Sequence, residues 1–384
     1  MKKKINREKG ITLIALVITI IILLILAGIS ISALTNQGLF KNAKTAQNAT
    51  EKAEAEQGQR LNEYEDEINK YLNNANEDEK IGLITDNINK ELSKTDNTKL
   101  KDEKGNRIVV PAGFKIVNGA TTVDKGIVIE DVTETATKGS QFVWIPVGTI
   151  TKSDGTTATI TLGRYDFDST TGKESAYSGS YIEEDTNDAS TLKKWGNTIA
   201  KNITKFKNSV ATNGGYYIGR YEARTVTARN AAGNALTQIT EKGTENVYNY
   251  VTQLQAAQLS QNMYNSDKFT SDLMNSYAWD TATVFIQNCG TNAKYSRQIS
   301  LNTSLLQTGT NSLTDTSKID VQCNIYDMAS NILEWTTETT DSSSFPCVYR
   351  GGFYGNSDHY TSCRDGNSTS DSNVIVGFRP LLYL

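Results

Sequence analysis

The sequence predicts an α+β protein whose chain begins with one long apolar helix, and three observations predict it. Residues 11–34 contain no charged side chain. From residue 108 onward, short strand-like runs alternate with turn residues, as in RIVV, GIVIEDV, QFVWIPV, ATITLGRY and GGYYIGRYEA. Apolar residues recur at helical spacing along residues 192–210 and 251–259, and a third helix is expected within residues 271–287. Strand runs with interspersed helices predict a mainly antiparallel sheet.

The apolar run of residues 11–34 predicts a membrane helix. As a helix it would span roughly 36 Å, which is enough to cross a bilayer. The run is too long for an ordinary cleaved signal peptide. The positive-inside rule keeps the N-terminus in the cytoplasm, because five basic residues precede the run: Lys2, Lys3, Lys4, Arg7 and Lys9. The C-terminal part is therefore expected outside the cell, at the cell surface.

The junction between Gly10 and Ile11 resembles a type IV prepilin leader, in which a short basic segment and a glycine precede a helix that opens like ITLIAL. The resemblance implies that prepilin peptidase cuts after Gly10 and that Ile11 becomes a methylated N-terminus. The helix would then be a membrane anchor or a filament stem. Pilins usually carry Glu at the fifth mature position, where this chain has Ala15. That departure favours a minor, tip or membrane-retained protein over a major pilin, and a plain signal anchor is the alternative.

Composition divides the chain into a leader (1–10), a transmembrane and stalk helix (11–73), a charged and polar linker (74–107) and a globular domain (108–384). An apolar stripe at spacings of three and four residues predicts the stalk: Leu61, Tyr64, Ile68, Tyr71 and Leu72. The net charge of -4 offers no basic footprint for nucleic acid. The pairing of the four cysteines stays open, and their spacing is not that of a zinc site: Cys289, Cys323, Cys347 and Cys363.

Five short motifs in the globular part together resemble the formylglycine-generating enzyme family. They occur in the family's order: FVWIPV (142–147), YIGRYEA (217–223), YDMASNILEWT (326–336), RGG (350–352) and GFR (377–379). The resemblance implies a variant of the C-type lectin fold for residues 108–384. An unrelated β-sandwich with chance matches is the alternative.

The same resemblance bears on catalysis, because enzymes of that family use a reactive cysteine pair just after the glycines of the RGG motif. Here residues 353–361 contain no cysteine, and Cys363 directly precedes Arg364. Copper binding by two thiolates needs both of them within reach. A lone histidine, His359, has no cysteine partner for another kind of site. The domain is therefore predicted to be non-catalytic, with an exported enzyme of unrecognised chemistry as an alternative.

The family also holds a structural calcium ion on the stretch that matches DMASNILE. Carried over by position, Asp327 and Glu334 would supply carboxylates, and Ser330 and Ile332 would supply backbone carbonyls. Oxygen ligands on one tight loop suit Ca²⁺. The family usually has Gly where Ser330 stands. The alternative is that these residues belong to the core and a turn.

Residues 353–376, called the restricted segment below, lack Lys, Glu, Gln, Met and Trp altogether. These five types make up 71 of the 384 residues, so a blank run of 24 should occur by chance about once in a hundred draws. An Asn codon whose two adenines change to any base can never encode those five types. All residues of the restricted segment lie within the set that such changes can encode.

This alphabet resembles that of the variable segment in target proteins of diversity-generating retroelements, where an adenine-mutating reverse transcriptase rewrites the end of a C-type lectin-like gene. RGG before the segment and GFRPLLYL after it resemble the constant frame of that family. The resemblance implies a surface receptor or adhesin that binds an extracellular ligand, a protein or a surface glycan, and other pilins are further candidate partners. An ordinary polar loop is the alternative for the segment, and a structural minor pilin with an invariant head is the alternative for the whole chain.

The ligand-binding residues predicted in the restricted segment share an expected exposure to solvent, with the aromatic ones as candidate anchors. They are Phe353, Tyr354, Gly355, Asn356, Asp358, His359, Tyr360, Thr361, Cys363, Asp365, Asn367, Thr369, Asp371, Asn373, Val374 and Ile375.

The prepilin-like junction predicts where the mature protein begins. N-terminal sequencing of protein from its native membrane should start at Ile11, and Gly10→Val should block the cut because the peptidase reads that glycine. A start at Met1, or beyond residue 30, would contradict the pilin interpretation.

Overall fold

The structure is a computed structural model, and the chain divides into two compact units, Met1–Asn76 and Glu77–Leu384. Of the first unit it describes only Ile18. In the second unit it describes residues 82–84, 88–90, 92–117, 120–185, 202–233, 238–264, 266–308 and 320–384. The predicted prepilin junction, the apolar run and the stalk therefore lie outside the described residues, apart from Ile18. Nowhere in the described part is there a helix with the length and apolar composition needed to cross a membrane.

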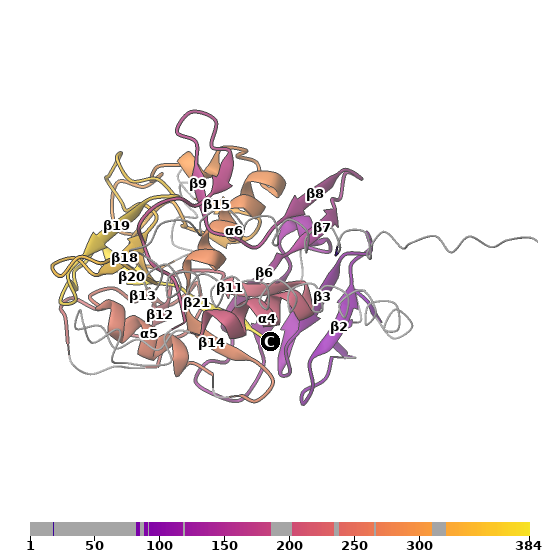
Figure 1. The fold of residues 1–384 in the computed structure, drawn as a ribbon. Helices are drawn as coiled ribbons and strands as arrows, with labels where there is room; N and C mark the ends of the chain where they lie inside the picture. Colours follow the sequence, from indigo (N-terminus) through magenta and orange to yellow (C-terminus); the bar gives the residue numbers. More distant parts are fainter. Residues whose placement is uncertain are drawn as a thin grey trace, which may run out of the picture. The chain divides into compact units, whose positions relative to one another are not determined.

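The largest sheet of the second unit has six strands in the order β14-β21-β11-β6-β5-β4, and all neighbouring pairs are antiparallel (Figure 1). Its strands are β4 (Phe114–Ile116), β5 (Val128–Asp131), β6 (Gln141–Pro146), β11 (Gly215–Gly219), β14 (Thr270–Leu273) and β21 (Pro380–Tyr383). The predicted mainly antiparallel sheet is confirmed. The last strand of the chain, β21, lies between β14 and β11, so the C-terminus is built into the middle of the fold.

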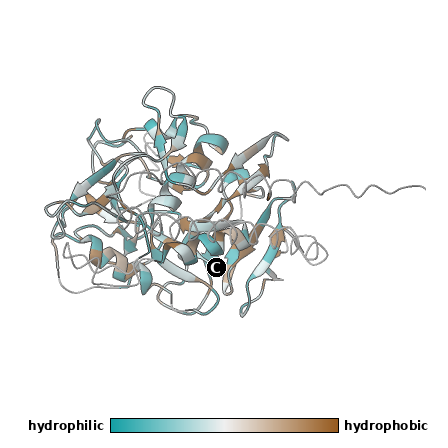
Figure 2. Ribbon diagram, viewed as in Figure 1, coloured by the Kyte–Doolittle hydropathy of each residue, from teal (hydrophilic) through white to brown (hydrophobic). Residues whose placement is uncertain are grey.

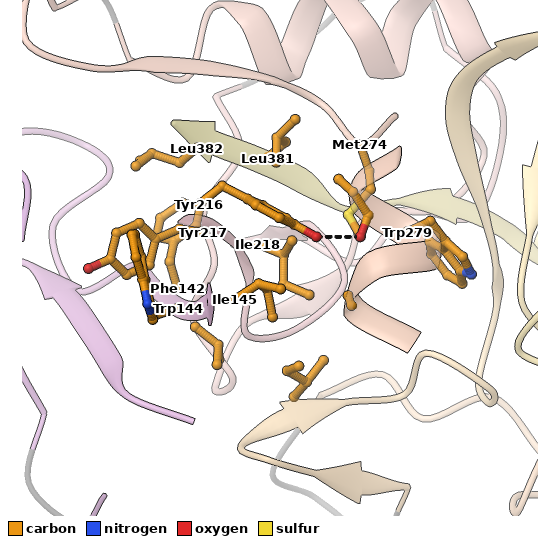
Figure 3. Close-up of a cluster of buried hydrophobic side chains, with 14 of the residues drawn as sticks. Phe142, Trp144, Ile145, Tyr216, Tyr217, Ile218, Met274, Trp279, Leu381 and Leu382 are labelled. Atoms are coloured by element: carbon orange, nitrogen blue, oxygen red, sulfur yellow. Dashed lines mark hydrogen bonds between the residues drawn. The ribbon is translucent and has the colours of Figure 1, made fainter. Parts of the chain in front are cut away.

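Aromatic and β-branched residues explain why the central strands form. Residues of β6 and β11 are buried almost throughout, as expected for strands that are covered on both faces. The rings of Trp144 and Tyr217 lie 5.0 Å apart across the pair (Figure 3). Tyr216 donates its hydroxyl to the Ala278 carbonyl at 2.7 Å, which satisfies a polar group that is otherwise buried.

Three α-helices are described: α4 (Ile203–Asn213), α5 (Gln253–Gln261) and α6 (Ser276–Cys289). Each begins at a side chain that accepts a backbone hydrogen bond: Asn202, Thr252 and Asn275 respectively. Helix α4 packs on β11 and β21, α5 on β14, and α6 on β6 and β8. In Figure 2 the helices carry both hydrophobic and hydrophilic residues, as the apolar stripes predict.

A second sheet of four strands carries the end of the chain, in the order β19-β18-β17-β20. Its strands are β17 (Leu333–Thr339), β18 (Cys347–Arg350), β19 (Arg364–Asn367) and β20 (Val376–Phe378). The β17–β20 pair is parallel and the other two pairs are antiparallel. The strand β20 runs directly into β21, which joins this sheet to the six-stranded sheet.

Shorter elements complete the unit. One sheet has three strands, β1 (Gly82–Leu83), β2 (Thr98–Lys101) and β3 (Arg107–Val110). Two-stranded pairs are formed by β7 (Gly148–Thr151) with β8 (Thr157–Ile160), β9 (Tyr165–Phe167) with β10 (Glu174–Ala176), β12 (Arg224–Thr225) with β13 (Asn246–Val247), and β15 (Val321–Gln322) with β16 (Ile325–Tyr326). The 3-10 helices are η2 (Ile88–Lys90), η3 (Val123–Lys125) and η4 (Tyr295–Arg297).

Several expectations differ from the described elements. The segment expected as a linker, 74–107, contains β1, η2 and β2, and it buries Ile88 and Leu100 in the core. Charged residues dominate this segment, so its few apolar residues formed no clear strand pattern in the sequence. The third predicted helix begins at Ser276 because the residues before it form β14, which pairs with β21. Of the stripe 192–210, the first part lies outside the described residues and the second forms α4.

Candidate ligand-binding surface

The restricted segment connects two strands of the four-stranded sheet, β18 and β20, which lie on either side of β17. It follows β18, contributes β19 in its middle and ends in β20. Figure 1 draws these three strands in yellow. Residues 350–352 and 377–379, called the frame below, flank the segment in sequence. Because β18 and β20 both pair with β17, the two halves of the frame are held by one strand.

Arg379 of the frame is fully buried, and its guanidinium donates hydrogen bonds to a carboxylate and to backbone carbonyls. Its guanidinium donates to both carboxylate oxygens of Glu334, at 2.6 and 3.1 Å. It also donates to the backbone carbonyls of Gly219 at 2.9 Å and Tyr326 at 2.7 Å. One side chain thus connects the residue between β20 and β21 with β17, β11 and β16.

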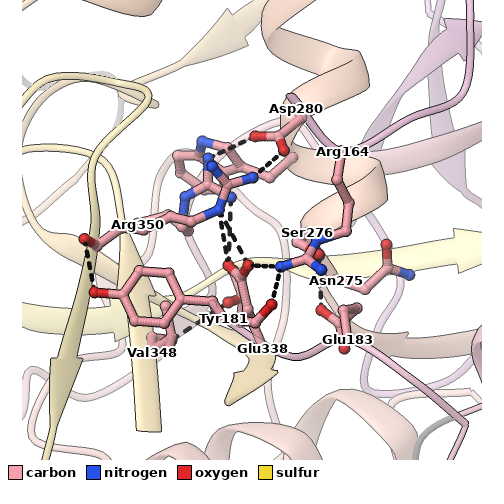
Figure 4. Close-up of polar contacts among 12 residues, drawn as sticks. Arg164, Tyr181, Glu183, Asn275, Ser276, Asp280, Glu338, Val348 and Arg350 are labelled. Carbon is pink, nitrogen blue, oxygen red and sulfur yellow. Dashed lines mark hydrogen bonds and ion pairs between the residues drawn. The ribbon is translucent and has the colours of Figure 1, made fainter. Parts of the chain in front are cut away.

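Arg350, the other frame arginine, belongs to a second buried network (Figure 4). It donates to Asp280 Oδ1 at 2.6 Å and, through Nε, to the Cys363 carbonyl at 2.8 Å, and one of its nitrogens lies 3.6 Å from Glu338 Oε2. Glu338 also accepts from Arg164. Burial of such charges is tolerable because each one faces an opposite charge.

Arg364 joins the same network although it lies inside the restricted segment. Its Nε donates to the two oxygens of Glu338 at 3.0 and 3.2 Å, it pairs with Asp280, and it donates to the Tyr165 carbonyl at 3.0 Å. Only 7% of its side chain is exposed. The side chain of Arg364 therefore stabilises the fold beneath the surface and is not accessible to a ligand.

Two frame glycines are required by close backbone contacts. Gly351 adopts φ +81°, and a Cβ there would lie 2.7 Å from the Met328 carbonyl oxygen. A Cβ on Gly377 would lie 2.9 Å from the Tyr248 carbonyl oxygen. No larger residue fits either position without a backbone shift.

Exposure within the restricted segment divides the predicted ligand-binding residues into three groups. Gly355, Asp358, Asp365 and Thr369 are exposed. Eleven are half-buried: Phe353, Tyr354, Asn356, His359, Tyr360, Cys363, Asn367, Asp371, Asn373, Val374 and Ile375. Thr361 is buried, against expectation, because its carbonyl accepts the Trp279 indole N–H at 2.8 Å and its N–H donates to the Gln298 carbonyl at 3.0 Å. Its side chain is withdrawn from any ligand on the surface.

The candidate aromatic anchors lie on the first loop of the segment. Phe353 packs partly against the core, and its ring lies 5.6 Å from the ring of His359. The guanidinium of Arg297 lies 3.5 Å from the centre of the Tyr360 ring, a contact that fixes this ring in place. Arg297 had no signal in the sequence, because η4 and the restricted segment are far apart in the chain.

Backbone contacts hold the loops of the restricted segment independently of most of its side chains. The Tyr354 N–H donates to the Asn331 carbonyl at 3.0 Å, and the Gly355 N–H donates to the Asn302 carbonyl at 2.9 Å. In the last loop, the Asn373 carbonyl accepts from the Tyr250 N–H at 3.0 Å. Such bonds survive a change of side chain, so they suit a surface whose side chains differ between proteins.

The four residues predicted to bind calcium lie close in sequence, but their contacts do not favour that site. Both oxygens of Glu334 face Arg379, and no group of three His, Cys, Asp or Glu residues suited to a metal occurs among the described residues. Only Asp327 has a feature that would suit a cation. Its buried Oδ1 has no hydrogen-bond partner, and burial together with the charge of Asp320 raises the pKa of Asp327 to about 7. Calcium stays a prediction.

The cysteines and the histidine show no sign of an activated nucleophile. All four cysteines are free, and burial raises the pKa of the Cys363 thiol, whereas reactive cysteines have a lowered pKa. His359 Nε2 lies 3.9 Å from Asp365 Oδ2, too far for a hydrogen bond. The absence of catalysis remains a prediction.

Comparison with known proteins gives only distant likenesses. No family model matches the chain, and no curated protein matches it. Among solved structures, variable protein 1 of Treponema denticola has a TM-score of 0.32 at 13% identity, over 65% of this chain and 98% of that one. PvdO from Pseudomonas aeruginosa has a TM-score of 0.34 at 12% identity, over 64% and 95%. CarF has a TM-score of 0.27 at 17% identity, over 36% and 67%. At these TM-scores the likeness does not establish a shared fold. The second unit is, in its described residues, mostly β-sheet with few helices.

Arg364 provides a test of which residues in the segment are structural. Arg364→Ala should lower the free energy of unfolding by about 3–5 kcal/mol, because it leaves Asp280 and Glu338 buried with fewer partners. The exposed control, Asp358→Asn, should change it by about 0.5 kcal/mol or less. Chemical denaturation of the two variants beside the unaltered protein measures both. Equal stability of all three proteins would show that Arg364 does not stabilise the fold.

Calcium is tested by melting the protein in calcium and in excess chelator. An ion held only by the native state stabilises it by about 2.7 kcal/mol at a hundredfold excess over Kd, so chelation should lower the melting temperature. Asp327→Asn should abolish the difference. Identical melting temperatures of the unaltered protein in both buffers would contradict calcium binding. Asp327 and Glu334 would then be turn and core residues.

Proposed function

We propose that the second unit binds an extracellular ligand, without catalysing a reaction, through side chains of the restricted segment that differ between variants of the protein. One observation carries this proposal: the charged residues of the frame and Arg364 are buried in ion pairs, while the residues with the restricted alphabet line exposed and half-buried positions above them. Stability and recognition thus rest on different side chains.

The type of residue at the surface supports binding. Tyr, Asn, Ser, Gly, Asp and Thr dominate the segment. Tyrosine gives a large contact area for a small loss of side-chain entropy, and the small polar residues adapt their hydrogen bonds to different partners. A protein or a surface glycan would suit this mixture of aromatic and polar groups.

Display at the cell surface is part of the proposal and rests on the sequence of residues 1–34. A cleaved, pilin-like helix would anchor the protein in the membrane or join it to a filament. The alternative function is a structural minor pilin whose head does not vary. Variation of the head between related cells separates the two functions, since a purely structural head has no reason to change in one segment only.

Sequencing of this gene across a population should show amino-acid changes concentrated in residues 353–376. Lys, Glu, Gln, Met and Trp should be almost absent among them, because changes at the adenines of Asn codons cannot produce those types. Thr361 and Arg364 should stay constant despite their position, and so should the frame. A flat profile of substitutions along the unit, or frequent Lys and Glu in the segment, would contradict the proposal.

Exchange of the restricted segment between two natural variants should transfer ligand preference. The melting temperature should change little, because exposed substitutions usually alter stability by about 0.5 kcal/mol or less each. The matched control is Asp154→Asn in the exposed turn between β7 and β8, which should leave the ligand preference unchanged. Retention of the original preference after the exchange of residues 353–376 would refute the assignment of the surface.

A further inference from the structure

A pocket of about 370 Å³ lies where the restricted segment meets a constant loop. One wall is the connection between β17 and β18, with Asp341 and Phe345. Asp365 and Gly366 of β19 form the opposite wall, and Tyr181 is also part of the lining. The pocket therefore combines residues from outside the segment with residues from within it.

The constant wall is held in a defined shape. Thr340 donates its hydroxyl to the Phe345 carbonyl at 2.8 Å, and Ser342 Oγ accepts the Phe345 N–H at 3.1 Å. A Cβ on Gly366 would lie 2.9 Å from the Phe345 carbonyl oxygen, so the two walls touch at this point. The side chain of Phe345 is not used to close the core, since 54% of the residue is exposed.

The lining of the pocket includes two aspartates and no Lys or Arg. Asp341 has no ion pair among the described residues, whereas Asp365 Oδ2 accepts the Tyr349 hydroxyl at 3.2 Å and lies 3.9 Å from His359 Nε2. The arginines closest in the fold, Arg164, Arg350 and Arg364, are directed into the buried network with Asp280 and Glu338 (Figure 4). After Lys318 the chain contains no lysine. The negative charge of Asp365 also contributes to the raised pKa of the Tyr181 phenol, after the effect of burial.

We propose that this pocket binds an arginine or lysine side chain of a polypeptide ligand, between the carboxylates of Asp341 and Asp365 and beside the ring of Phe345. A cationic head on an apolar stem matches both features, because the carboxylates attract the charge and the aromatic ring covers the methylenes or the planar guanidinium. The proposal deepens the proposed function and rests on it.

Variants of the protein would differ in only one of the two walls of the pocket. Asp341 and Phe345 lie outside the restricted segment, whereas Asp365 lies within it and is exposed. Every variant would keep half of the cation site, and a change at position 365 would tune its strength. A cation would be a shared element of many ligands, and the remaining side chains would select among them.

The test uses the full chain and two peptides, acetyl-Gly-Arg-Gly-amide and the same peptide with citrulline, which has the shape of arginine without its charge. Calorimetry should show saturable binding of the arginine peptide only, weaker at higher ionic strength. Asp341→Asn and Phe345→Ala should each weaken it at least tenfold. The matched control is Asp154→Asn, an exposed acid in the turn between β7 and β8, outside both the pocket and the restricted segment, which should leave the binding unchanged.

Three outcomes would overturn the proposal: no saturable binding of the arginine peptide, equal binding of the citrulline peptide, or an equal loss in Asp341→Asn and Asp154→Asn. The last would indicate a general surface charge. The segment exchange described above is independent of these outcomes. If it transfers ligand preference while the arginine peptide fails to bind, the pocket is refuted and the proposed function stands. If the peptide binds and the segment exchange does not transfer ligand preference, the pocket stands and the proposed function is refuted.

Discussion

The buried ion pair between Arg379 and Glu334 is the constraint on which the C-terminal half of this unit depends. Arg379 stands between β20 and β21, the two strands that belong to different sheets. By pairing with Glu334 on β17 and donating to the carbonyls of Gly219 and Tyr326, it fixes the junction of those sheets. Removal of one partner from such a pair costs far more than the pair itself contributes, because an unpaired charge stays buried. This end of the frame is therefore fixed by contacts with residues outside the restricted segment.

Arg350 and Arg364 form buried ion pairs of the same kind. Both reach Asp280 on α6 and Glu338 on β17, and Arg364 does so from within the restricted segment. The segment is thus two stretches separated by an anchor at the start of β19. Loops held at three points by buried ion pairs and backbone hydrogen bonds need little help from their own side chains. This separation of support from recognition allows many surface sequences on one fold.

The sequence predicted the antiparallel sheet and the helices near α4 and α5, because each has a local signal: alternating or continuous apolar runs for the strands, and helical spacing of apolar residues for the helices. It did not predict the fold of residues 82–101, where few apolar residues stand among many charged ones. It also placed Thr361 at the surface, since nothing in the residues around Thr361 reveals that Trp279 donates to its carbonyl. Asp280, Arg297 and Glu338 were missed for the same reason. Their roles depend on partners 70, 63 and 26 residues away, respectively, that only the fold brings together.

The restricted alphabet itself has a physical advantage at such a surface. Lys, Glu, Gln and Met, four of the five excluded types, are among the side chains that lose the most rotamer freedom on ordering, up to about 2 kcal/mol each. A segment without them presents side chains that lose less entropy when a ligand immobilises them. Arg, the flexible type that remains available, occurs once in the segment and is already ordered by Glu338 and Asp280. The absence of Lys and Glu from the segment also means that neither of these long side chains competes there for Arg350 or for the carboxylates of Asp280 and Glu338.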